Sequence, residues 1–561
     1  MSGANENKIT ALYCRLSQED EQIREALAVQ KQDRSKKLGQ ILVEQGYITE
    51  KEVLDALGKR MGLQIIKLDN FKVDTNAVAR IPKQLATKYN MIAIAEDESK
   101  LTVAMSDPLN FYAVEDVRQT TGMTLEVYLC ESNNIVAAID RYYAEISTKS
   151  AAQQANISVD IPTTQAVQEL EDADVGDDVP IVKFLNSLLV HGYTTHASDI
   201  HIEPFEKETV VRLRTDGMLV QYVTLAASVN KQLIARIKIM SGLDIAERRV
   251  PQDGHFRQII EGYDMNVRVS TLPTVYGEKA VLRYLATNNK LDRTESYGMN
   301  QENYAKMQTI LRNPNGIIYI TGPTGSGKTT TLYMILDTLA QKPINVSTVE
   351  DPVERTLPHI NQTQVNVLAG MTFAAGLRSL LRQDPDVIMV GETRDGETAE
   401  ISVRAAITGH LVCSTLHTND AISSIVRLED MGVEPYLVAN SVVGIVAQRL
   451  MRKVCPNCIE EYEPDNVECE AMGAHPATVV RGKGCHQCNN TGYKGRIAIH
   501  EIVVIDKTLR RMIADNADID DMVRYAVEEQ GMSTLKASAL KLVEEKITTV
   551  EEMLKICQTA E

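Results

Sequence analysis

Apolar positions near the start of the chain follow a helical spacing that occurs twice. The two sets are Ile23, Ala26, Leu27 and Gln30, and then Val53, Ala56, Leu57 and Arg60. Thr49 and Glu52 form a capping-box pair that predicts the start of the second helix. Three strands and a further helix are predicted over residues 91–94, 101–104, 125–129 and 133–143. This mixture predicts a small α+β domain.

The larger, C-terminal part of the chain has different patterns. Residues 180–290 alternate short strands with helices. Residues 296–450 repeat a strand, a loop and a helix, and the strands at 317–320 and 387–390 are apolar at every position. Such strands are typical of a parallel sheet that is covered by helices. Residues 499–561 are mainly helical, so the chain is predicted to be an α/β multidomain protein.

An acidic stretch divides the chain. Residues 150–182 carry seven acidic residues and no Lys or Arg, which is typical of a solvated linker. The predicted segments are an N-terminal domain (1–148), a linker (149–178), a second domain (179–292) and a third domain (293–561). Within the third domain, residues 453–498 are predicted to form a cysteine-bearing insert, and residues 499–561 the C-terminal helices.

Composition limits the possible functions. The 561 residues include 44% hydrophobic and 24% charged residues, both ordinary for a globular protein. A net charge of −17 and 5% aromatic residues, without Trp, disfavour nucleic-acid binding. No apolar run reaches the roughly 18–20 residues needed to span a bilayer, and no signal peptide is recognisable. We therefore expect a cytoplasmic protein.

A glycine-rich segment between a predicted strand and a predicted helix matches the P-loop pattern. Glycines let backbone N–H groups surround phosphate oxygens, and the helix N-terminus adds positive potential. We expect Lys328 to reach the β- and γ-phosphates of a nucleotide and Thr329 to ligate Mg²⁺. The predicted binding residues are Gly322, Pro323, Thr324, Gly325, Ser326, Gly327, Lys328, Thr329 and Thr330.

Two acidic segments follow the P-loop, as a P-loop enzyme requires. Glu350 lies in the first of them. Glu392 follows the apolar run 387–390, so we expect its carboxylate beside the P-loop, where it can orient the attacking water or act through Mg²⁺. Acidic residues at the start of loops usually cap helices or are solvated. Here their position after a P-loop in the sequence favours a catalytic role.

Two histidines flank a later apolar strand. His410 precedes this strand and His417 follows it, and the strand itself contains Ser414 and Thr415. Together these residues are candidates for sensing a γ-phosphate. A structural role is the alternative for each histidine.

Four of the nine cysteines form two Cys-x-x-Cys pairs. Cys455, Cys458, Cys485 and Cys488 would make a closed tetrahedral Zn²⁺ site, whose role is structural because no coordination position stays open. Unligated thiols and a redox pair are the alternatives, and the 26-residue gap disfavours an iron–sulfur cluster. The remaining scattered cysteines indicate reduced thiols rather than a disulfide framework.

These motifs together resemble the secretion ATPases of type IV pili and type II secretion. The resemblance covers residues 177–561 and is strengthened by segments 197–204 and 249–254. It implies a cytoplasmic homohexamer that uses ATP and Mg²⁺, with a PAS-like second domain and a RecA-like third domain. Retraction enzymes of this family lack the cysteine insert and the long N-terminal part, so the chain resembles the assembly type.

The resemblance also assigns roles by position. Arg268 and Arg283 match nucleotide-facing arginines of the PAS-like domain, which stabilise transition-state charge as the site closes. Glu350 and Glu392 match the Asp-box and Walker B glutamates, and with His417 these residues form the predicted catalytic set. Three further arginines match positions at domain or subunit contacts, with surface salt bridges as the alternative: Arg378, Arg382 and Arg394.

The N-terminal domain resembles the domain that binds cyclic di-GMP in some pilus assembly ATPases. That domain uses two repeats that open with Arg-Leu-Gly and close with Gln. Here the first repeat lacks Arg-Leu-Gly, and the second has Lys37 and Arg60 in place of Arg and Gln. Lys does not replace Arg where a group is held bidentately, so cyclic di-GMP is a candidate ligand only. Residues 9–17 resemble the opening of serine recombinases, without the catalytic core that should follow.

We therefore predict a Mg²⁺-dependent P-loop ATPase that powers type IV pilus assembly at the cytoplasmic face of the inner membrane. Its expected partners are an inner-membrane platform protein and a cytoplasmic adaptor, which hold it peripherally. The alternatives are a type II secretion ATPase that drives a pseudopilus and a nucleotide-sensing scaffold without turnover. A RecA-like nucleic-acid translocase is disfavoured by the net charge and the cysteine insert.

Overall fold

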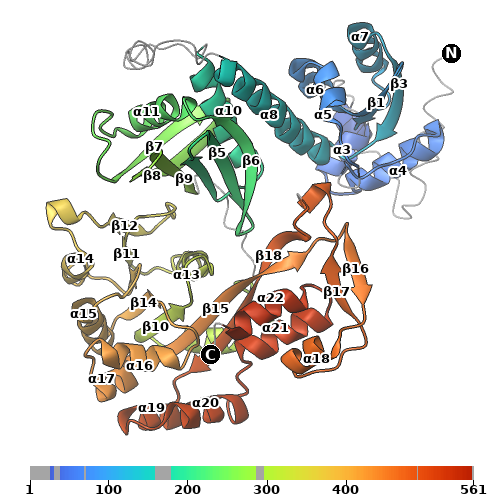
Figure 1. The fold of residues 1–561 in the computed structure, drawn as a ribbon. Helices are drawn as coiled ribbons and strands as arrows, with labels where there is room; N and C mark the ends of the chain where they lie inside the picture. Colours follow the sequence, from blue (N-terminus) through green and yellow to red (C-terminus); the bar gives the residue numbers. More distant parts are fainter. Residues whose placement is uncertain are drawn as a thin grey trace. The chain divides into compact units, whose positions relative to one another are not determined.

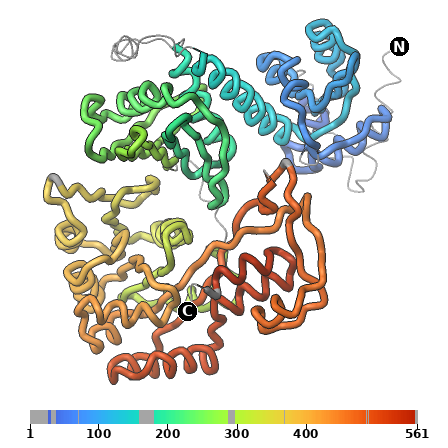
Figure 2. Tube along the Cα trace, viewed as in Figure 1, coloured from blue at the N-terminus to red at the C-terminus, as the bar shows by residue number. Residues whose placement is uncertain are grey.

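The computed structural model separates the chain into two compact units. They are residues 1–284 and 285–561 (Figure 1, Figure 2). The described residues are 26–30, 38–68, 71–157, 179–285, 296–488 and 490–558. Ile23, Lys37 and the recombinase-like stretch 9–17 lie outside the part of the chain that the structure describes.

The N-terminal part of the first unit combines helices with a three-stranded sheet. Its elements are α3 (Leu38–Glu44), α4 (Glu50–Met61), α5 (Thr75–Arg80), α6 (Lys83–Tyr89), β1 (Met91–Asp97), β2 (Lys100–Met105), α7 (Phe111–Thr121), β3 (Thr124–Leu129) and α8 (Ser132–Ile157). β2 lies between β1, antiparallel, and β3, parallel. The Thr49 hydroxyl accepts the Glu52 N–H at 3.3 Å, and the Glu52 carboxylate accepts the Thr49 N–H at 2.8 Å. The predicted strands and capping box are confirmed.

Helix α8 is longer than predicted. It runs from Ser132 to Ile157, although the sequence pattern placed its end at residue 143 and the start of a linker at 149. Its later turns carry small buried residues that join the core formed with α10 (Pro180–Thr194): Ala144, Ala151, Ala152 and Ala155. The prediction for residues 149–157 was therefore wrong, because these alanines form a packing face. The rest of the predicted linker, 158–178, lies outside the described residues.

A six-stranded sheet follows in the first unit. Its elements after α10 are β4 (Asp199–Pro204), β5 (Glu208–Thr215), β6 (Met218–Ala226), α11 (Val229–Ser241), β7 (Gln252–Ile260), β8 (Tyr263–Thr274) and β9 (Gly277–Leu285). The strand order is β6-β5-β4-β9-β8-β7. Ile200 and Ile202 share one core with apolar residues of α10 and α11. Because side chains alternate along a strand, Asp199, His201 and Glu203 lie on the opposite face.

The second unit is built on a seven-stranded sheet. Its elements through β15 are α12 (Gln301–Ile310), β10 (Gly316–Thr321), α13 (Lys328–Leu339), β11 (Val346–Glu350), β12 (Asn361–Gln364), η3 (Val367–Ala369), α14 (Phe373–Leu380), β13 (Val387–Val390), α15 (Gly396–Ile407), β14 (Leu411–Leu416), α16 (Ser423–Asp430), α17 (Pro435–Ser441) and β15 (Val442–Val454). With β18 (Tyr493–Val504), the order is β12-β11-β13-β14-β10-β15-β18. Neighbouring strands are parallel apart from β15 and β18.

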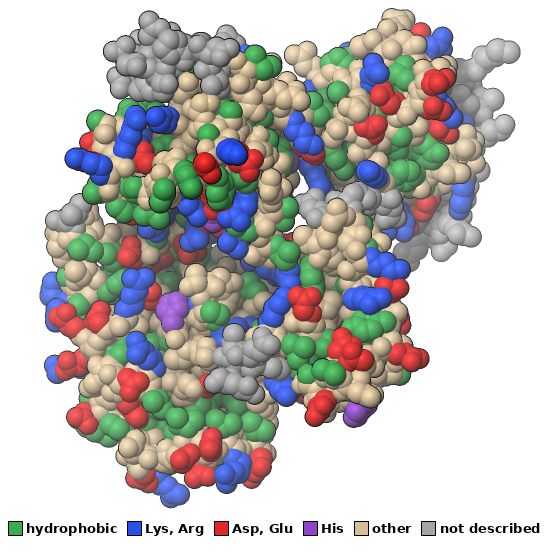
Figure 3. Space-filling model, viewed as in Figure 1, with side chains coloured by type: hydrophobic (Ala, Val, Ile, Leu, Met, Phe, Trp, Pro, Cys, Tyr) green, Lys and Arg blue, Asp and Glu red, His purple; other side chains and the backbone are tan. Residues whose placement is uncertain are grey.

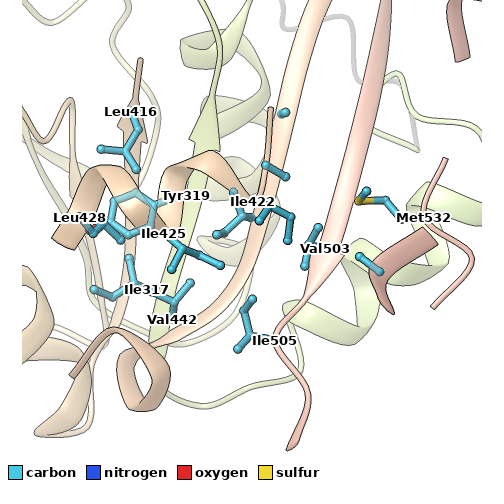
Figure 4. Packing of buried hydrophobic residues seen from close by; sticks show 14 of the residues in the cluster. Ile317, Tyr319, Leu416, Ile422, Ile425, Leu428, Val442, Val503, Ile505 and Met532 are labelled. Atoms are coloured by element: carbon cyan, nitrogen blue, oxygen red, sulfur yellow. The ribbon is translucent and has the colours of Figure 1, made fainter. Parts of the chain in front are cut away.

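Both faces of this sheet are buried. Ile317 and Tyr319 of β10 belong to one core cluster, which Figure 4 shows beside Ile425 and Leu428 of α16. Ile318 and Ile320 alternate with them and belong to a second cluster, together with residues of α12 and α13. A strand that is apolar at every position therefore serves two cores, as the sequence predicts for a parallel sheet between helices.

The segment between β15 and β18 carries its own two-stranded sheet, and its buried residues join the main core cluster. It contains β16 (Ile459–Tyr462), α18 (Asn466–Met472), β17 (Val479–Gly482) and η4 (His486–Cys488), and β16 pairs antiparallel with β17. Four helices follow β18: α19 (Lys507–Ala514), α20 (Ile519–Glu528), α21 (Leu535–Glu544) and α22 (Val550–Gln558). The predicted helical segment 499–561 thus begins with the last residues of a strand, and its first helix starts at Lys507.

The surface carries charges of both signs. On the face seen in Figure 3, Lys and Arg side chains are interspersed with Asp and Glu. Among the described residues, no helix is long and apolar enough to cross a membrane.

Candidate active site

The predicted catalytic residues of the second unit come from one edge of its sheet. β10, β14, β13 and β11 are parallel neighbours, so their carboxyl ends meet there. This edge is where open α/β sheets bind ligands. The P-loop follows β10, His417 follows β14, and Glu392 lies two residues beyond β13.

The P-loop joins β10 to α13, which begins at Lys328. Gly322 has φ 146° and Gly327 has φ 85°, values that residues other than glycine rarely adopt. The Lys328 Nζ donates to the carbonyl oxygens of Gly322, at 2.7 Å, and Pro323, at 3.1 Å. The predicted loop and its helix are thus in the arrangement that the motif requires.

The Lys328 ammonium is buried. Burial lowers its pKa to about 8, although the nearby Glu392 carboxylate acts in the opposite direction. Arg449, on β15, lowers it further. A buried cation without full solvation favours a polyanion as its partner.

Glu392 is enclosed by cationic and polarisable groups. Its carboxylate forms an ion pair with Arg394 at 2.5 Å and lies 3.7 Å from the His417 Nε2. Burial lowers the pKa of His417, and the neighbouring Lys328 lowers it further. Both effects favour the neutral imidazole form of His417, although the adjacent Glu392 carboxylate acts in the opposite direction.

Hydroxyl groups of β14 hold the loop that carries Glu392. The Thr415 hydroxyl donates to the Gly391 carbonyl at 2.8 Å, and the Thr393 and Ser414 hydroxyls are 2.9 Å apart. Ser414 and Thr415 are both buried. Their hydroxyls, predicted to help sense a γ-phosphate, are engaged in positioning the Glu392 loop.

The two histidines lie at opposite ends of β14. His410 precedes the strand, and its Nδ1 is 2.9 Å from the Ala405 carbonyl oxygen at the end of α15. His417 follows the strand and lies beside Glu392. The prediction that both act together at the phosphate was therefore wrong for His410, because a six-residue strand separates them.

Glu350 ends β11 and is buried. Its carboxylate accepts hydrogen bonds from the Tyr333 hydroxyl, from Thr348 at 2.5 Å and from Gln362 at 3.0 Å. Tyr333 belongs to α13, so Glu350 ties the helix that follows the P-loop to β11. A direct catalytic role of Glu350 stays a prediction.

Arg268 and Arg283 belong to the first unit. They lie on β8 and β9, on the strand faces opposite the apolar core, and both are exposed. The Arg283 Nε pairs with Asp199 at 2.7 Å, and more than half of the Arg283 side chain stays accessible. Their predicted contact with a nucleotide stays a prediction.

The three further arginines have different partners. Arg378 pairs with Glu397 at 2.7 Å, and both side chains are exposed, as the salt-bridge alternative expects. The Arg382 Nη1 donates to the Arg378 carbonyl at 2.8 Å. Arg394 instead pairs with Glu392, within the candidate site.

Gln448 on β15 is a site residue that no sequence motif indicates. Its side-chain amide bonds to two residues of the P-loop region, Ser326 and Thr331, each at 2.8 Å. The only local signal is a polar residue that interrupts the apolar run 442–447. A buried polar side chain in a core strand needs a partner, which here is the P-loop.

The four predicted cysteines come together where β15 and β18 leave the sheet. Their Sγ atoms lie within 4.8 Å of one another. The Cys455–Cys485 and Cys458–Cys488 sulfurs are 3.8 Å apart, and Cys485 and Cys488 are 3.7 Å apart. Sulfurs bound tetrahedrally at about 2.3 Å from Zn²⁺ would be about 3.8 Å apart. The donor set and its spacing therefore fit Zn²⁺.

Backbone groups prepare this cluster for a thiolate. The N–H groups of Cys485 and Gly492 each lie 3.2 Å from the Cys488 Sγ. Burial alone would raise the pKa of Cys488, but these two donors, together with the Cys485 and Cys458 thiols, lower it to about 7. Such backbone donors are typical of cysteine ligands to metals.

Known proteins resemble the chain along most of its length. A family model described as type II/IV secretion system protein matches residues 174–555, and a model of the MshEN domain matches residues 61–148. The type IV pilus assembly ATPase PilB of Myxococcus xanthus is 40% identical over 561 residues, covering 98% of this chain and 97% of that protein. The type II secretion system protein E of Pseudomonas aeruginosa is 41% identical over 491 residues, covering 85% of this chain and 96% of that protein.

A solved structure shares the fold. The ATPase DotB of Legionella pneumophila covers 67% of this chain and 95% of its own, with a TM-score of 0.51 and 22% identity. This likeness confirms the predicted RecA-like α/β core. The PAS-like character of the second domain and the metal in the insert stay predictions.

Proposed function

This chain belongs to the type II/IV secretion system protein family, and we propose that it hydrolyses ATP to power assembly of a type IV pilus. The observation that carries the proposal is the single sheet edge that presents the P-loop, Lys328 and Glu392. The pilus is favoured over a type II pseudopilus because the similarity to the pilus assembly ATPase extends over 98% of this chain, against 85% for the secretion protein.

In the proposed reaction, Lys328 and the P-loop N–H groups hold the β- and γ-phosphates of ATP. The Thr329 hydroxyl would be one ligand of Mg²⁺, which would neutralise phosphate charge. Arg394 and His417 hold the Glu392 carboxylate in place. This carboxylate orients the water that attacks the γ-phosphorus. ADP then leaves with its β-phosphate oxygen carrying the electrons of the broken bond.

We extend the proposal to the assembly. Arg268 and Arg283 would stabilise the transition-state charge when the first unit closes on a nucleotide, in a homohexamer whose hydrolysis drives rotation between domains. The partners would be an inner-membrane platform protein and a cytoplasmic adaptor, with the enzyme peripheral at the cytoplasmic face of that membrane. The cysteine cluster would bind Zn²⁺ and thereby link the end of β15 to the start of β18.

Cyclic di-GMP is the proposed ligand of the N-terminal part. The MshEN match begins at residue 61, the last residue of α4, so it leaves out nearly all of the two helices that carry the second repeat. On those helices Leu42 is buried and Arg60 is exposed, so Arg60 is accessible to a ligand. Isothermal titration with cyclic di-GMP tests this role, and Arg60→Gln, which restores the family residue, should bind at least as well as the wild type.

The test of the main proposal is ATP hydrolysis by the full-length protein, measured as phosphate release at increasing protein concentration. Lys328→Ala should lose both binding and turnover, whereas Glu392→Gln should bind ATP and lose turnover. Glu397→Gln is the matched control, because Glu397 is an exposed acid of α15 that pairs with the exposed Arg378. ATP binding without hydrolysis by the wild type would favour the scaffold alternative.

The choice between pilus and pseudopilus needs a cellular assay. Replacing the gene with the Glu392→Gln form should abolish surface pili and leave protein secretion intact. Loss of secretion with pili retained would refute the pilus assignment and favour the type II alternative.

A further inference from the structure

Gln448 contacts the P-loop with both ends of its side-chain amide. Its Nε2 donates to the Ser326 carbonyl at 2.8 Å, and its Oε1 accepts from the Thr331 hydroxyl at 2.8 Å. The side chain is 2% exposed. β15 is parallel to β10 with Thr321 opposite Ala447, so Gln448 stands beside the first residue of the P-loop.

The contact is also close-packed. A Cβ atom on Gly322 would lie 2.4 Å from the Gln448 backbone oxygen, and one on Gly327 would lie 2.9 Å from its Nε2. Both glycines have positive φ. The glycines of the motif therefore provide room for Gln448, in addition to allowing the backbone to turn around phosphate.

We propose that Gln448 is a positioning residue for the nucleotide, which fixes the P-loop in its phosphate-binding shape. This inference rests on the proposed nucleotide site. Gln448 acts through Ser326 and Thr331, at the last turn of the loop and the first turn of α13. The Gln448 amide donates to the Ser326 carbonyl, whereas the buried Ser326 hydroxyl has no hydrogen-bond partner among the described residues.

The expected effect follows from the groups left behind. Without the amide, the buried Ser326 carbonyl loses its side-chain donor, and the Thr331 hydroxyl keeps the longer contact, 3.4 Å, to the Gly327 carbonyl. These losses favour other loop conformations. When only a fraction of molecules has the competent shape, the apparent dissociation constant rises by the inverse of that fraction. A roughly tenfold weaker binding of ATP corresponds to a loop that is competent about one tenth of the time.

Gln448→Met is the principal test, because Met is similar in length and has no hydrogen-bond donor. Titration of a fluorescent ATP analogue should show a dissociation constant about tenfold higher, and KM should rise while kcat at saturating ATP stays within about threefold. Thr331→Val removes one of the two bonds and should have a smaller effect. The double variant should bind more tightly than the product of the two effects predicts, because both act on one contact.

Gln448→Glu adds a readout that a merely structural residue would not give. A carboxylate cannot donate to the Ser326 carbonyl, but a protonated carboxyl group can. Relative to the wild type at the same pH, this variant should therefore regain affinity for the analogue as the pH falls from 8 to 6. Gln341→Met, at an exposed glutamine of the same unit, is the matched control.

Unchanged nucleotide affinity in both Gln448→Met and Thr331→Val, within twofold, would overturn the inference, whatever happens to their melting temperatures. If Gln448→Met does not fold, Thr331→Val and the pH response of Gln448→Glu decide. Because the readout is binding, a wild-type chain that binds ATP without hydrolysing it would refute the proposed function and leave this inference standing.

Discussion

Raising the pH from 7 to 9 should weaken nucleotide binding about tenfold, because the Lys328 ammonium loses its proton in this range. Burial lowers the pKa of Lys328 to about 8, against an ordinary value of 10.5. The charged ammonium is the form that attracts phosphate oxygens. A solvated lysine stays protonated between pH 7 and 9, so a site built on one would show no change in nucleotide affinity over this interval.

The magnitude follows from the protonated fraction. With a pKa of about 8, roughly 90% of free molecules carry the charge at pH 7 and roughly 10% at pH 9. Phosphate raises the pKa of the lysine in the complex, so binding above pH 8 takes up a proton. The affinity is therefore flat below pH 8 and falls by up to tenfold for each further pH unit.

The assay is titration of the full-length protein with a fluorescent ATP analogue at constant ionic strength from pH 6.5 to 9.5. Calorimetry at pH 8.5, in buffers of different ionisation heat, should report proton uptake that is absent at pH 6.5. Lys328→Arg keeps its charge throughout, so any affinity it retains should not fall above pH 8. A wild-type affinity that stays constant between pH 7 and 9.5, without proton uptake, would refute a buried lysine with a lowered pKa.

Three further predictions concern stability and the loop. Burial raises the pKa of Glu552, but hydrogen bonds from Arg452 and Lys555 lower it to about 2. Glu552→Gln should therefore reduce the free energy of unfolding by about 3 kcal/mol above pH 5. Because the wild-type carboxylate protonates as the pH falls from 4.5 towards 2, urea unfolding should show this difference shrinking there. Gly322→Ala should abolish binding of the ATP analogue while circular dichroism stays unchanged, since its Cβ would meet the Gln448 carbonyl. Cys488→Ser should lose bound zinc in elemental analysis and melt at a lower temperature, whereas Cys413→Ser, at a buried cysteine outside the cluster, should keep its zinc.

Local patterns predicted the elements whose partners are close in the sequence. The P-loop, the Thr49–Glu52 capping box and the two Cys-x-x-Cys pairs each depend on residues a few positions apart. The end of α8 could not be predicted this way. The acidic composition of the following residues predicts that 149–157 belong to the linker, whereas the structure places alanines of this segment in a core with α10. That core depends on residues across the predicted linker, so composition alone does not reveal it.

Strand direction and register explain the outcome at the site. A residue just beyond the carboxyl end of a parallel strand reaches the active edge, which selects Glu392 and His417 and excludes His410 at the opposite end of β14. The direction of each strand can be inferred from the order of motifs along the chain. Register cannot, because nothing in the sequence states that Thr321 pairs with Ala447. This pairing makes β15 continue past the end of β10, and it is the reason why a residue in the middle of one strand can hold the loop that follows another.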